Sequence, residues 1–341
     1  MYLKDLPTSV SGRKVCDSLA DSKVFRSARD FRVQGAEKYT SHVAEACASL
    51  RTKKILLVGP ETTYYLHSLW LNALEAHEHR IHECPGPEFC NFHHICLPAN
   101  YTAPQDRYKF APKDGELVNS ALLRYVLSTS LYASKDKNDT AYTEAVVDPL
   151  TGIRLKNAFW LLHARKADVI LLNRGPIPAP AWTFAGHKTQ GNWTFARELP
   201  RHLGEGDSLR TEIINAAFHA TVTRFIPELL ESLRAIYKDP WIRHKTLAWH
   251  ASWSIEADFV DPWALYYNAQ VYMQNYLLRT LLPGHGVHFL SRMIPSGLAL
   301  EDLPTKSSPQ DRLRFPLGKP NAHAMEAVFL KSLIELLECV G

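Results

Sequence analysis

The stretch that most constrains the fold runs from Lys53 to Trp70 and reads KKILLVGPETTYYLHSLW. It begins with the unbroken apolar run 55–58, which is typical of a strand buried on both faces of a parallel sheet. Gly59 and Pro60 end that run, and from Thr62 onward apolar residues recur at helical spacing. A buried strand, a tight turn and a helix present side chains above the carboxyl end of an α/β sheet. We therefore expect this turn to carry functional groups.

Later segments repeat the alternation of strands and helices. Strands are predicted over 168–172, 246–250 and 288–290, and the first two end in Asn173 and His250. Helices are predicted over 36–50, 116–132, 157–164, 208–237 and 261–282, with Pro227 expected to kink or split the fourth. The pattern predicts the α/β class.

Length and charge exclude several functions. The 341 residues are 46% hydrophobic, enough for one large α/β domain with a substantial core. The net charge of +4 is mild and no dense Lys/Arg stripe occurs, so a nucleic-acid partner is not expected. No apolar run approaches the roughly 20 residues that span a bilayer, and the polar segment 1–26 is not typical of a secretory signal.

The order of these segments resembles the SGNH-type PC-esterase superfamily, which includes the plant trichome-birefringence-like polysaccharide O-acetyltransferases and fungal capsule acetyltransferases. The chain looks like a fungal-type member. The resemblance implies a three-layer α/β/α sandwich around a central, mostly parallel sheet. It implies one domain over 1–341, with a lead-in over 1–51 and loop insertions at about 77–115 and 176–207.

The family motifs are only partly kept. Where the family has Gly-Asp-Ser with a nucleophilic serine, this chain has Gly59-Pro60-Glu61. The family's Asn-x-Gly, whose asparagine helps to form an oxyanion hole, is matched by Asn173 and Gly175. The family's Asp-x-x-His becomes Asp311-Arg312-Leu313-Arg314, and arginine cannot act as a base at neutral pH. His323, nine residues after Arg314, is a candidate replacement for the lost histidine.

These positions predict a set of catalytic residues. Glu61 is expected to act as a general acid if burial keeps it protonated, or as a base if Arg174 or Arg314 keeps it ionised. His250 is the histidine best placed for proton transfer, with Trp249 making its surroundings apolar. Thr62 and Thr63 follow the turn by one and two residues beyond Glu61, and we expect such displaced hydroxyls to point away from the site. The predicted catalytic residues are Glu61, His250, Asp311 and Asn173, and the predicted substrate-binding residues are Gly59, Thr62, Arg174, Gly175, Arg314, His323, Trp182 and Trp249.

Three functions remain open at this point. The first is an SGNH-fold enzyme with Glu61 in place of the serine, acting on an acyl, ester or small lipophilic substrate. The second is a non-covalent acid/base catalyst such as an isomerase, cyclase or lyase of secondary metabolism, and the third is an inactive glycan-binding protein. An enzyme is favoured because the polar residues fall at predicted strand ends. The expected partner is a small-molecule or carbohydrate substrate, and no cofactor is expected.

The cysteines allow two interpretations. The segment 77–98 is rich in His and Cys, and a zinc site there would use Cys84, Cys90, His93 and Cys96. The alternative is a loop closed by a disulfide, which the irregular spacing favours. Six cysteines and glycosylation sequons at Asn100, Asn138 and Asn192 leave the secretory-pathway lumen and the cytoplasm equally open.

Overall fold

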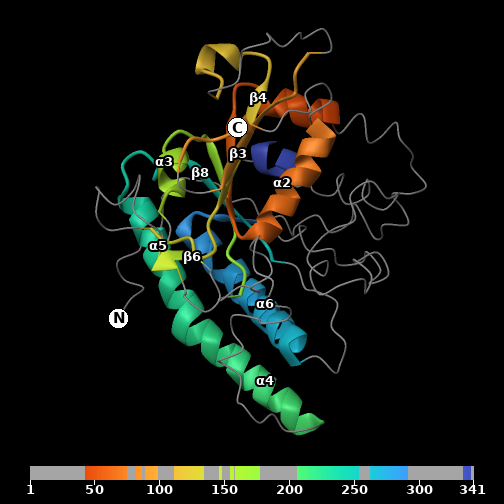
Figure 1. The fold of residues 1–341 in the computed structure, drawn as a ribbon, viewed down its shortest axis with the longest axis vertical. Coiled ribbons are helices and arrows are strands. Elements are labelled where there is room, and N and C mark those ends of the chain that lie inside the picture. Colours follow the sequence, from red (N-terminus) through yellow and green to blue (C-terminus); the bar gives the residue numbers. More distant parts are fainter. Residues whose placement is uncertain are drawn as a thin grey trace, which may run out of the picture.

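The apolar run 55–58 forms the middle of β1 (Lys54–Gly59), the central strand of the structure, as predicted. The computed structural model describes residues 43–74, 82–86, 89–98, 111–133, 146–147, 154–156, 158–176, 206–252, 262–290 and 333–338. Within them the chain forms a seven-stranded, mostly parallel sheet with helices, which confirms the predicted α/β class (Figure 1).

The strand order of this sheet is β2-β3-β4-β1-β7-β8-β9. Five neighbouring strands run parallel, namely β4 (Ala121–Leu127), β1, β7 (Val169–Leu172), β8 (Thr246–His250) and β9 (His288–Leu290). At one edge β3 (Cys90–Ile95) pairs antiparallel with β4, and β2 (His82–Glu83) pairs antiparallel with β3. A separate antiparallel pair joins β5 (Val146–Val147) to β6 (Arg154–Lys156).

Alternate residues of β1 belong to two different hydrophobic clusters, because successive side chains of a strand point to opposite faces. Leu56 and Val58 pack in a cluster with α3 (Trp160–Ala164) and α5 (Ile226–Lys238). Ile55 and Leu57 pack in a second cluster with α2 (Glu61–Leu74) and with the helical segments 43–50 and 333–338. We call these two sides the α5 face and the α2 face of the sheet.

The long predicted helix over 208–237 is split, as Pro227 requires. It consists of α4 (Asp207–Ala220), a π-helical turn (Thr221–Phe225) and α5. Proline has no N–H to donate and its ring crowds the carbonyl of the preceding turn, so the regular hydrogen-bond ladder cannot continue through it. α4 packs along α6 (Pro262–Leu281) through a third apolar cluster that includes Ile213, Ala217 and Val271 (Figure 1).

The helix predicted over 116–132 is wrong, since that segment contains a 3₁₀ turn (Asp114–Glu116) and then β4. Its Leu and Ala residues have high helix propensity, but pairing with β1 on one side and β3 on the other outweighs that preference. A second 3₁₀ turn (Pro283–His285) leads into β9.

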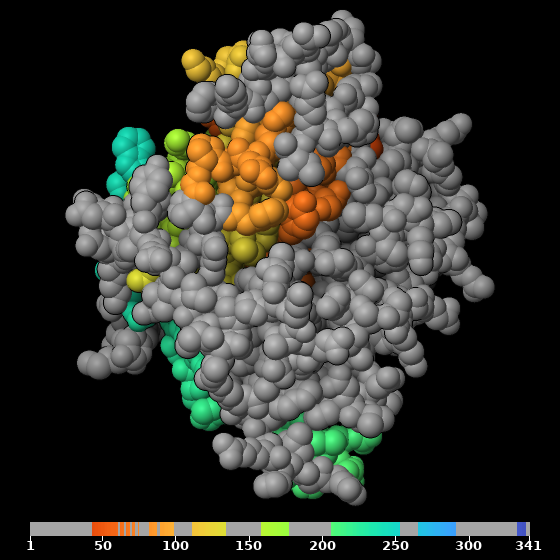
Figure 2. Space-filling model, viewed as in Figure 1, coloured from red at the N-terminus to blue at the C-terminus, as the bar shows by residue number. Residues whose placement is uncertain are grey.

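The exterior follows from the same elements. Figure 2, drawn from the same side as Figure 1, shows exposed residues of the β2–β3 segment next to α2. The start of α4 is visible at the bottom of the same view. Among the described helices, none has the length and apolar character of a membrane span.

Candidate active site

The turn after β1 meets the ends of β7 and β8 on one edge of the sheet. Val58 is in register with Leu172, and Leu172 is in register with Trp249, so the next residues along are Gly59, Asn173 and His250. The Tyr125 hydroxyl, from β4, is within 3.1 Å of the carbonyl oxygens of Gly59 and Pro60. After β1, the chain first adds β4 on one side of this strand and later adds β7 on the other side. Ligand sites of α/β proteins lie at such switch points, outside the carboxyl ends of the strands.

Thr63 and His250 form a hydrogen-bonded pair at this edge. The Thr63 Oγ1 atom lies 3.0 Å from Nε2 of His250, and both residues are fully buried. On the other side of the ring, Nδ1 lies 3.2 Å from the carbonyl oxygen of Ala251, which can only accept a hydrogen bond. Nδ1 therefore carries the proton in the neutral ring, and Nε2 accepts from the threonine hydroxyl. Burial lowers the pKa of His250 to about 4, so the ring is neutral at pH 7.

Asn173 holds the end of β8 in place. Its Nδ2 donates to the carbonyl oxygen of His250 at 2.8 Å and to Oγ of Ser252 at 3.0 Å. The amide cannot be turned the other way, because two oxygens would then face each other at the His250 carbonyl. Asn275 of α6 fixes Ser252 through two further bonds, to its N–H at 3.0 Å and to its carbonyl at 2.7 Å.

The predicted role of Asn173 as an oxyanion donor is not supported by this arrangement. Both amide hydrogens are used within the protein, so the side chain positions His250 instead of pointing at a reacting carbonyl. The buried Oδ1 atom of Asn173 has no hydrogen-bond partner in the part of the chain that the structure describes. It is an acceptor that a bound hydroxyl or a water is able to fill.

Arg174 lies on the opposite face from the Thr63–His250 pair. Its guanidinium is buried beside the Phe225 ring, 5.4 Å from the ring centre, and its Nη2 is ion-paired with Glu228 of α5. Burial lowers the pKa of Arg174, and the Glu228 carboxylate acts in the opposite direction. Trp249 is also fully buried and belongs to the cluster on this α5 face. The structure therefore places Arg174 and Trp249 in the core, away from the pair.

The remaining predicted residues are only partly placed. Glu61 is the first residue of α2, two positions before Thr63, and its side chain lies outside the described part of the structure. Thr62 is buried, and Gly175 lies close to Pro60 and to the Tyr267 hydroxyl. Asp311, Arg314, His323 and Trp182 lie outside the described residues.

The expectation that Thr63 points away from the site is wrong. Helix α2 begins directly at Glu61, so its first turn brings Thr63 back over the end of β1, and the Thr63 N–H bonds to the Pro60 carbonyl at 2.9 Å. Sequence reasoning also missed Ser252, Asn275 and Tyr125. Ser252, two residues past a predicted strand tip, was the only one of the three with a positional signal.

The four proposed metal ligands do not come together. Cys84 is bonded to Cys90 and Cys96 is bonded to Cys47, as disulfides. His93 instead packs against His67 on the α2 face, with 5.2 Å between ring centroids. His163 does approach the first disulfide, with Nε2 at 3.9 Å from Sγ of Cys90. Sulfurs joined to each other are not the thiolates that zinc requires, so this arrangement supports the disulfide interpretation.

Comparison of the chain with known protein families, with curated proteins and with solved structures found no match.

Proposed function

We propose that the protein is an acyl-transfer enzyme of the SGNH type in which Thr63 is the nucleophile and His250 is the general base. The observation that carries this proposal is the 3.0 Å contact from Thr63 Oγ1 to Nε2 of His250 at the carboxyl edge of the sheet. A hydroxyl bonded to an imidazole, with the far ring nitrogen held by a third group, is the arrangement that activates alcohol nucleophiles.

The reaction has two balanced halves. The Thr63 oxygen attacks the carbonyl carbon of an ester or acyl donor while its proton passes to Nε2 of His250. The tetrahedral intermediate collapses, the bond to the donor oxygen breaks, and Nε2 returns the proton to that oxygen. Water or an acceptor alcohol then attacks the acyl-threonine ester by the same steps and regenerates Thr63.

The surroundings of the pair suit this chemistry. Burial lowers the pKa of His250 to about 4, so Nε2 is unprotonated at pH 7, and the 3.0 Å contact with Thr63 places it to take the proton. The positive end of the α2 dipole lies at Thr63 and favours negative charge that develops there. Asn173 and Asn275 fix the end of β8, so the ring does not have to be ordered when substrate arrives.

We further infer that the apolar clusters on the two faces of the sheet correspond to the three-layer α/β/α arrangement of the SGNH hydrolases. The motif resemblance of Gly59, Asn173 and Gly175 supports the same family. The two disulfides at Cys47–Cys96 and Cys84–Cys90 favour an oxidising compartment such as the secretory lumen.

Labelling with a fluorophosphonate tests the assignment. We expect the unmodified chain to gain one phosphonyl group, with peptide mass spectrometry placing it on Thr63. Thr63→Val keeps the side-chain volume but removes the hydroxyl, and should abolish labelling and turnover of 4-nitrophenyl acetate. Ser68→Ala removes another hydroxyl of α2, one that bonds to the Tyr64 carbonyl, and as the matched control it should retain both. Labelling that survives in Thr63→Val would refute the covalent mechanism.

The position of Glu61 favours a second candidate, a non-covalent acid/base catalyst. As the first residue of α2, Glu61 belongs to the same turn as Thr63, and a carboxyl group is a common general acid or base. This function predicts that Glu61→Gln abolishes turnover while Thr63→Val retains it. Binding of glycans by the unmodified chain, with no turnover of any ester, would instead support an inactive glycan-binding protein.

A further inference from the structure

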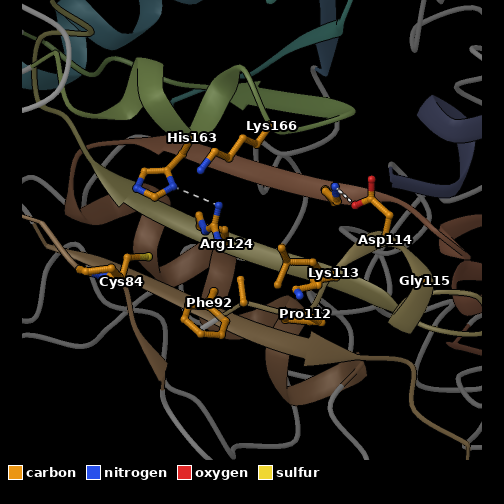
Figure 3. A pocket seen from close by; sticks show the side chains of 13 residues that line it. Cys84, Phe92, Pro112, Lys113, Asp114, Gly115, Arg124, His163 and Lys166 are labelled. Atoms are coloured by element: carbon orange, nitrogen blue, oxygen red, sulfur yellow. Dashed lines mark hydrogen bonds and ion pairs between the residues drawn. The ribbon is translucent and has the colours of Figure 1, made fainter. Parts of the chain in front are cut away.

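A second candidate site lies on the α5 face, which is the opposite face of the sheet from Thr63 and α2. A cavity of about 650 Å³ opens there, within the size range of pockets that hold small molecules (Figure 3). Phe92 and Leu122 of its lining belong to the cluster on this face, whereas Thr63 belongs to α2 on the other face. The cavity is therefore distinct from the candidate active site.

The cavity is strongly cationic. Its lining contains Lys54, Lys113, Arg124 and Lys166, against one carboxylate from Asp114. That carboxylate is paired with Lys54 at one end of the cavity (Figure 3). Within the described ranges, no carboxylate pairs with the other three cationic groups. An uncompensated cluster of this kind is stabilised by a bound anion.

Arg124 is held in place for such a role. Its Nη1 donates to Nδ1 of His163 at 3.0 Å, and its guanidinium lies 5.7 Å from the centre of the Phe92 ring. Burial lowers the pKa of Arg124 to about 10, which leaves it charged at pH 7. Burial, with Arg124 and Lys166 nearby, lowers the pKa of His163 to about 3, so His163 adds no charge of its own and acts as a hydrogen-bond acceptor.

The donors converge at one side of the cavity. Figure 3 shows the Lys166 side chain extending from the loop after α3 toward Arg124 and His163. The Nε atom of Arg124 is buried and has no hydrogen-bond partner within the described ranges, so its donor is unused. Apolar groups complete the wall: Phe92, Leu122, Ala111 and Pro112. A guanidinium and an ammonium next to an apolar wall match a doubly charged head group on a small organic body.

We propose that this cavity binds a small phosphate monoester, with Arg124 and Lys166 holding the phosphate and the wall around Phe92 holding the organic part. Phenyl phosphate is a suitable probe, and isothermal titration calorimetry on the full chain measures its affinity. We expect it to bind about tenfold or more tightly than inorganic phosphate or benzyl alcohol, because each of these lacks one of the two contacts. The affinity should fall with added salt, since charge pairing is screened.

Variants separate the proposal from a general attraction to a basic surface. Lys166→Gln and Arg124→Gln should each weaken phenyl phosphate binding by about tenfold or more. Lys238→Gln changes the net charge equally, but lies at the exposed end of α5 outside the lining, and should leave the affinity unchanged. Lys166 has no ion pair or side-chain hydrogen bond among the described residues, so its variant keeps the test valid if Arg124→Gln unfolds. Equal affinities in Lys166→Gln and Lys238→Gln, or equal binding of phenyl phosphate and inorganic phosphate, would overturn the proposal.

Discussion

Gly59→Ala gives the sharpest test of how the candidate active site is packed. A Cβ at this position would lie 2.2 Å from Oγ1 of Thr63 and 2.9 Å from the backbone oxygen of Asn173, both closer than real Cβ contacts come. Neither neighbour yields easily, because Thr63 is fixed in the first turn of α2 and the Asn173 oxygen is backbone. Overpacking of a core costs about 1–3 kcal/mol. Displacing the Thr63 hydroxyl from His250 adds about 0.5–1.5 kcal/mol. We therefore expect the free energy of unfolding to fall by about 1.5–4.5 kcal/mol.

Urea unfolding followed by tryptophan fluorescence measures this loss as a lower midpoint with an unchanged slope. Gly284→Ala is the matched control, because nothing lies within 4 Å of a Cβ added there, and it should be neutral or slightly stabilising. In a Thr63→Ala background the nearest clashing atom is gone, so Gly59→Ala should cost less, although the 2.9 Å approaches to the Asn173 oxygen and to the Cβ of residue 63 remain. If Gly59→Ala is as stable as Gly284→Ala, or if its cost is the same in both backgrounds, the close packing described for this turn is incorrect.

Three further predictions concern stability. The folded pKa of His250 is about 4 against an ordinary 6.5, so the unfolded chain binds more protons than the folded chain between these pH values. The free energy of unfolding should therefore fall by about 3 kcal/mol as the pH drops from 6.5 to 4. Urea titrations of His250→Gln at each pH should lack this part of the pH dependence. Glu228→Gln leaves the buried guanidinium of Arg174 without its ion-pair partner and should cost about 1–2 kcal/mol, a value reduced because the carboxylate is half exposed. Glu231→Gln, at an exposed position of the same helix, should leave the midpoint of thermal denaturation unchanged. Replacing Cys47 and Cys96 by alanine opens a 49-residue loop and should cost about 4 kcal/mol, against about 2 for the six-residue disulfide; equal losses would contradict the loop-entropy reasoning.

Local sequence patterns were sufficient to predict the strands and the helix that surround the candidate active site. The apolar run 55–58, the Gly59-Pro60 break and the helix that follows are all found where the sequence places them. The strand ends at Asn173 and His250 were also predicted, because a buried parallel strand is a short apolar run with a polar residue at its tip. The prediction over 116–132 failed because Leu and Ala residues favour a helix locally, while β4 is decided by its pairing with β1 and β3.

The sequence by itself determined which strands are buried and which polar residues stand at their ends. Only the tertiary structure decided which of these residues meet. The Thr63–His250 contact joins residues 187 positions apart, and Arg174 turns to the α5 face although Asn173 next to it stays with His250. The physical reason is that the period of a strand specifies which face of the sheet each of its side chains points to. Which residues of different elements come into contact depends on strand register and on how the helices pack.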